Sequence, residues 1–78
     1  MDVRAEKKLS AGDVRAERNR HRPPVTQQEL AEEMGYYQPY LSAIERGEFE
    51  LAQQEYHRLL DGIGAIVARR VEGENGAK

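Results

Sequence analysis

The sequence predicts an all-α fold of four to five short helices. Apolar residues recur at helical spacing along most of the chain, helix start and stop signals separate the segments, and no stretch alternates apolar and polar residues as a β-strand does. The chain has 78 residues and no cysteine, so one small core must hold without disulfides. We therefore expect one helical domain over residues 10–71, an N-terminal segment 1–9 that is flexible or helical, and a disordered tail 72–78.

The first helix is predicted from about residue 11 to about residue 21. Ser10 and Asp13 have the spacing of a capping box, in which each side chain satisfies a backbone amide at the helix start. Pro23-Pro24 ends the helix, because neither ring can donate to a helical hydrogen bond. The arginine cluster 15–22 forms either a solvated helix face or an arm that contacts phosphates.

The next two helices are short and close together. Thr26 and Glu29 form a full capping box, and Gly35 is suited to the left-handed conformation just past a helix C-terminus. Pro39 then marks the first turn of another helix, which Gly47 closes. Because only a few residues separate the two helices, they must cross sharply rather than lie side by side.

Beyond Gly47 the helical pattern resumes. We predict a fourth helix at roughly 52–61, followed after Gly62 and Gly64 by a shorter fifth helix or a bent continuation to about residue 71. This last part carries Ile66, Val67 and Val71. So small a core cannot bury all three, so we expect a symmetric homodimer through the C-terminal segment.

Composition restricts the function classes without choosing one. The net charge is −2, with residues 1–25 at net +3 and residues 26–78 at net −5. A chain basic throughout would favour nucleic acid, whereas here the case for DNA must come from a site. No apolar run approaches the roughly 20 residues of a membrane span, and the N-terminus lacks the apolar part of a signal peptide, so we expect a cytoplasmic protein without membrane association.

Catalysis and metal binding are not expected. His21 and His57 are far apart in sequence and make a poor metal site. The chain offers no nucleophile–base pair, no metal-ligand set and no phosphate loop, and the core is too small for a pocket. We therefore predict that the protein is not an enzyme and uses no cofactor.

Residues 27–46 resemble the helix-turn-helix of the Xre-type family, which includes phage repressors and Cro-like DNA-binding proteins. The segments "TQQELAEEMG" and "YLSAIERG" carry the resemblance, which extends over roughly residues 14–64. The family pattern of apolar, small and glycine positions is met in register by Leu30, Ala31, Met34, Gly35, Tyr36, Leu41 and Ile44. The resemblance implies a repressor-like domain whose second helix, about residues 38–46, enters the major groove.

The resemblance also implies roles for individual residues at this surface. Gln38 matches the leading base-reading position, where a glutamine can bond adenine N6 and N7. Ala43 matches a second base-facing position and could contact only a thymine methyl group. Gln27 corresponds to a phosphate contact at the start of the first helix of the pair, and Arg46 to a cation for the DNA backbone.

Other positions depart from the family pattern. Tyr37 and Tyr40 replace small polar residues and could bond phosphates or press a ring against a thymine methyl, and Pro39 replaces a residue that often reads a base. Glu48 and Glu50 stand in the loop after Gly47, where related proteins commonly have Lys or Arg.

Glu45 matches a position that usually bonds an arginine of the first helix. Arg15, Arg18 and Arg20 are all candidates, and Arg18 is favoured.

The expected function is that of a small dimeric, sequence-specific regulator of transcription that binds double-stranded DNA at a palindromic operator. Proteins of this kind occur as repressors, restriction–modification controllers and antitoxins. The alternative is a protein-interaction module, in which the helix-turn-helix fold has weak or no DNA binding and its tyrosines contact a protein partner.

Overall fold

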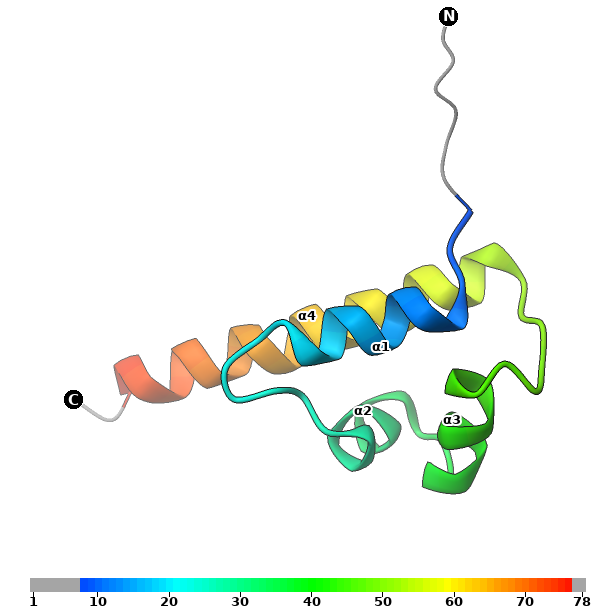
Figure 1. Ribbon diagram of the computed structural model, residues 1–78. Coiled ribbons are helices and arrows are strands. Elements are labelled where there is room, and N and C mark those ends of the chain that lie inside the picture. Colours follow the sequence, from blue (N-terminus) through cyan, green and yellow to red (C-terminus); the bar gives the residue numbers. More distant parts are fainter. Residues whose placement is uncertain (1–7, 77–78) are drawn as a thin grey trace, which may run out of the picture.

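Four α-helices and no β-strand make up residues 8–76, the part of the chain that the computed structural model describes. Their bounds are α1 Ala11–Asn19, α2 Gln27–Met34, α3 Gln38–Glu45 and α4 Gln53–Gly76. In Figure 1, α1 lies alongside the long α4, and α2 and α3 pack beneath this pair. The predicted all-α class is confirmed.

The two predicted capping boxes form at the starts of α1 and α2. The backbone amide of Ser10 donates to Asp13 Oδ2 at 2.8 Å. The amide of Thr26 donates to Glu29 Oε1 at 2.9 Å, and the amide of Glu29 donates back to Thr26 Oγ1 at 3.0 Å. These local bonds satisfy amides that have no partner within the helix, so they fix where each helix begins.

Glycines end α2 and α3 with the same geometry. Gly35 has φ +73° and Gly47 has φ +82°, conformations that a side chain disfavours. Past Gly35, the Tyr36 amide donates back to the carbonyl of Ala31 at 2.8 Å. Past Gly47, the Glu48 amide does the same to the carbonyl of Ala43 at 3.0 Å. Each bond closes a Schellman motif that reverses the chain sharply. Residues 35–37 are therefore a short turn between two separate helices.

Of the two alternatives for the C-terminal part, the separate fifth helix is wrong, because α4 continues as one helix of 24 residues. Gly62 lies buried where α2 crosses α4, and a Cβ atom there would come within 2.8 Å of Met34 Sδ and 3.2 Å of Leu30 Cδ1. This glycine thus permits close helix packing instead of ending a helix. The helix also continues through Gly76, so the expected tail 72–78 begins too early, and residues 77–78 lie outside the described part. Of the N-terminal segment, residues 8–10 form no helix and residues 1–7 are not described.

The hydrophobic core draws side chains from all four helices and from the loop before α2. Its buried residues are Val14, Val25, Leu30, Ala31, Leu41, Ile44, Tyr56, Leu59, Ile63 and Ile66. Of the three residues assigned to a dimer, Ile66 is only 6% exposed and belongs to this core, and Val67 packs partly buried against it. Val71 alone is well exposed, at 53%. The core therefore takes up more of the apolar side chains of α4 than we expected from the size of the domain.

No helix within residues 8–76 is both long enough and apolar enough to cross a membrane.

Candidate nucleic-acid interface

A buried ion pair joins α1 to the end of α3. Arg18 Nε donates to Glu45 Oε2 at 2.8 Å, and Arg18 Nη2 donates to Glu45 Oε1 at 2.7 Å. Arg18 is 8% exposed and Glu45 is 4% exposed. Arg18 Nη1 also donates to the carbonyl of Val25 at 2.8 Å, which ties the entry of α2 to the same guanidinium. Bidentate geometry and a third bond compensate the cost of removing these charges from water.

Arg18 is therefore the partner of Glu45, as favoured from the sequence. Arg15 instead donates to the backbone carbonyl of Glu45 at 3.2 Å. Arg20 turns away and pairs with Glu17 at 2.9 Å. Position within α1 decides the choice, because only Arg18 lies on the buried face of the helix with Val14.

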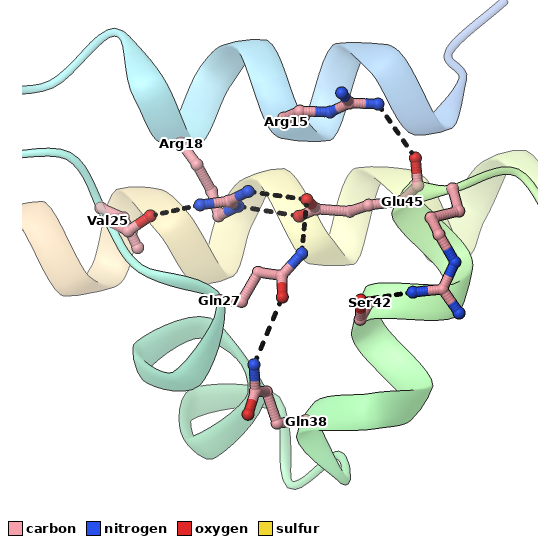
Figure 2. Close-up of polar contacts among 8 residues, drawn as sticks. Arg15, Arg18, Val25, Gln27, Gln38, Ser42 and Glu45 are labelled. Carbon is pink, nitrogen blue, oxygen red and sulfur yellow. Dashed lines mark hydrogen bonds and ion pairs between the residues drawn. The ribbon is translucent and has the colours of Figure 1, made fainter.

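A chain of hydrogen bonds leads from this ion pair to the surface. Gln27 Nε2 donates to Glu45 Oε1 at 3.1 Å, and Gln38 Nε2 donates to Gln27 Oε1 at 3.3 Å. Figure 2 shows these contacts in sequence, from Arg18 on α1 to Gln38 at the start of α3. Gln38 is exposed. The exposed Gln38 amide is thus bonded to Gln27, which is bonded in turn to the buried carboxylate of Glu45. These bonds reduce the number of orientations that the Gln38 side chain adopts.

Arg46 follows the last residue of α3 and is held by two side-chain contacts. Its Nη1 donates to Ser42 Oγ at 2.8 Å, and its Nε donates to Glu48 Oε2 at 2.8 Å. The side chain remains 58% exposed. Arg46, the cation expected to contact the DNA backbone, is therefore exposed, but it forms an ion pair with the carboxylate of Glu48 in the following loop.

Aromatic rings gather on another side of α3. The rings of Tyr36 and Tyr40 form a T-shaped pair with centroids 5.2 Å apart, and the Tyr40 ring lies 5.5 Å from the ring of Phe49. We call Tyr36, Tyr40 and Phe49 the aromatic cluster. Tyr40 is 40% exposed and Phe49 46%, and the neighbouring Tyr37 reaches 78%. Phe49 was missed from the sequence, although an isolated aromatic between two glutamates in a loop is a usable signal of exposure.

Tyr36 anchors the aromatic cluster to the core. It is partly buried against the core residues, and its hydroxyl donates to the carboxylate of Glu55 on α4. Burial, followed by the hydrogen bond and the negative charge of Glu55, raises the pKa of Tyr36 to about 12. The phenol therefore stays protonated and holds the turn between α2 and α3 against α4.

Ala43 does not present the surface expected of it. It is only 8% exposed. A thymine methyl has little of this side chain to touch, and we remove Ala43 from the candidate interface. Pro39 stays exposed in the first turn of α3. The structure thus brings Gln27, Gln38 and Glu45 together, with Arg46 just past the end of α3 and Tyr40 on another side of that helix.

Within residues 8–76, no three His, Asp or Glu side chains lie close enough together to hold a metal ion. Comparison with protein-family models, with curated proteins and with solved structures found no match. The resemblance of residues 27–46 to a known family therefore depends on those residues alone.

Proposed function

We propose that the protein binds double-stranded DNA in a sequence-dependent manner, with α3 in the major groove. The observation that supports this most is the exposed Gln38 amide at the start of α3, oriented through Gln27 by the buried Glu45. A glutamine amide can bond N6 and N7 of one adenine, and each good bidentate contact contributes about 1–3 kcal/mol of discrimination. Prior ordering of the amide lowers the entropy lost on binding.

Phosphate contacts would set the position of α3 on the duplex. Gln27 lies in the first turn of α2, where backbone amides favour an anion, and Arg46 lies just beyond the other end of α3. Phosphate contacts at Gln27 and Arg46 would fix the position of Gln38 along the base pairs of the duplex. Few cations stand on this face, so one subunit would bind non-specific DNA weakly.

Weak binding by one subunit favours a dimer on a palindromic operator. The last turns of α4 extend beyond α1 (Figure 1). In the C-terminal part of α4, Val71 is exposed and Val67 is partly buried against the core. We place the contact with a second copy on these two residues, without Ile66. Occupancy of an operator near a promoter would make the protein a regulator of transcription.

Selection of bound sequences from a randomised duplex pool at low salt tests the proposal. We expect the wild type to enrich one short motif that contains adenine, and Gln38→Ala to lose at least tenfold in affinity for it. Gln54→Ala is the matched control, because Gln54 is an exposed glutamine in the first turn of α4. If the wild type enriches no sequence, or if both variants bind alike, the proposed role of α3 fails.

A second candidate function is docking of a protein partner. The exposed rings of Tyr37, Tyr40 and Phe49 favour it, because grouped aromatics at a surface mark interaction sites. Gln38 and Tyr40 are two residues apart in one helix and hence about 200° apart around its axis. Tyr40→Ser and Phe49→Ser therefore discriminate the two functions: they leave DNA binding intact under the first and abolish partner binding under the second.

A further inference from the structure

The loop after α3 carries a carboxylate to Arg46, a cation at the end of the proposed DNA-binding helix. Gly47, with φ +82°, reverses the chain, and the Glu48 amide closes the turn on the carbonyl of Ala43 at 3.0 Å. This geometry returns the Glu48 side chain toward Arg46, whose Nε donates to Glu48 Oε2 at 2.8 Å. The backbone thus sets the proximity of the two side chains.

The Arg46 guanidinium is occupied on two of its nitrogens. Glu48 takes Nε, and Ser42 Oγ takes Nη1 at 2.8 Å, so the side chain is directed along the end of α3. Both partners of the ion pair are more than half exposed, at 58% and 52%. The pair is therefore open to solvent and to exchange with a phosphate, and it is not locked in the core.

We infer that Glu48 is an internal competitor for the DNA phosphate at Arg46, and that it sets how strongly this surface binds duplex DNA irrespective of sequence. The inference depends on the proposed function. A phosphate oxygen and a carboxylate oxygen offer Arg46 the same charge-assisted bond, so each excludes the other from Nε. While Glu48 holds Arg46, the pair is neutral, and contact with DNA releases few counterions there.

The expected effect is measurable as a salt dependence. Each phosphate that a cation neutralises on duplex DNA contributes about −0.9 to the slope of log affinity against log salt concentration. Glu48→Gln should therefore steepen the slope by up to about 0.9 and raise the affinity at low salt. A fourfold change in salt would then alter the affinity of this variant by about 3.5-fold more than that of the wild type.

Glu50→Gln is the matched control. Glu50 stands two residues further along the same loop, is exposed, and makes no ion pair within the described part of the chain. The Glu50→Gln substitution removes the same charge from the same loop but leaves the ion pair of Arg46 and Glu48 in place. Its effect should be smaller and should be the same in the presence and absence of Arg46, because it acts only through the general field.

A double-mutant cycle completes the test. Fluorescence anisotropy measures the salt slope of the wild type, Glu48→Gln, Arg46→Ala and the double variant, each on a selected duplex and on an unrelated duplex. Arg46→Ala should change the wild-type slope little and should abolish the gain from Glu48→Gln. Melting curves confirm that each variant is folded.

The outcomes separate the inference from the proposed function. Binding of the selected duplex with an unchanged slope in Glu48→Gln, or a gain that survives Arg46→Ala, overturns the inference alone. Absence of binding to any duplex by the wild type and by Glu48→Gln overturns the proposed function and this inference with it.

Discussion

The buried pair of Arg18 and Glu45 makes the sharpest prediction about stability. Glu45→Ala leaves Arg18, a residue only 8% exposed, without its carboxylate partner, and it also removes the acceptor of the Gln27 amide. Loss of one partner from a buried ion pair costs about 3–5 kcal/mol. A domain of this size has a total unfolding free energy of roughly 4–12 kcal/mol. The single change therefore removes a large share of the stability.

The assay is thermal and urea unfolding followed by circular dichroism. In a domain of this size each kcal/mol shifts the melting temperature by roughly 4–8 °C, so Glu45→Ala should lower it by about 12 °C or more. Glu17→Ala is the matched control, because Glu17 lies on the same helix as Arg18 and its partners are Arg20, whose side chain is 67% exposed, and His21 at 3.3 Å. Its loss should cost less than about 1 kcal/mol.

A double variant tests whether the cost comes from the unpaired charge. Arg18→Met combined with Glu45→Leu removes both charges and fills similar volume, so it should lose clearly less than the two single variants together. The reasoning is refuted if Glu45→Ala costs no more than Glu17→Ala, or if the two single effects simply add in the double variant.

Three further predictions concern α4 and the aromatic cluster. Gly64→Ala should raise the free energy of unfolding by about 0.5–1 kcal/mol, since a Cβ atom there meets nothing within 4 Å. Gly62→Ala should raise the free energy of unfolding less, or lower it, since its Cβ atom meets Met34. Urea unfolding measures both variants. The pKa of Tyr36 is raised from 10.0 to about 12, so the folded state holds the phenol proton more tightly than the unfolded chain does. The resulting contribution to stability is complete below pH 10 and declines as the pH rises toward 12. Unfolding curves of Tyr36→Phe across this pH range should lack that part of the decline. Val71→Asp should convert the proposed dimer to a monomer in sedimentation at micromolar concentration, and its circular dichroism spectrum should be unchanged. A wild-type protein that sediments only as a monomer would contradict the proposed dimer.

Local signals in the sequence were sufficient for most helix ends. The capping box of Thr26 and Glu29 and the left-handed glycines at 35 and 47 act within a few residues, so their consequences can be worked out without the rest of the fold. The continuity of α4 could not be predicted in this way, because the role of Gly62 depends on Met34, which lies in another helix. Tertiary packing decides such positions against local helix propensity.

The candidate site was predictable to a similar extent. The pairing of Arg18 with Glu45 and the exposure of Gln38 agree with the positions inferred from the sequence. The burial of Ala43 was not predicted, because the exposure of a residue on a short helix depends on how the helices pack together. Hydrogen bonds between side chains of different helices, such as those of Gln27, likewise require the assembled fold.

The acidic balance of the chain is consistent with DNA binding once the partners of its carboxylates are considered. Glu33 forms an ion pair with Arg69, and Glu29 lies 3.5 Å from Arg70, so acidic side chains of α2 face arginines of α4. These pairs join two packed helices within the protein. A phosphate at α3 would respond to the nearest charges, because separated exposed charges are screened beyond about 8 Å at physiological salt. Under the proposed function, the state of Arg46 should therefore matter more to binding than the net charge of the molecule. A change confined to Glu48 should then alter binding more than the same charge change at Glu32, an exposed glutamate of α2.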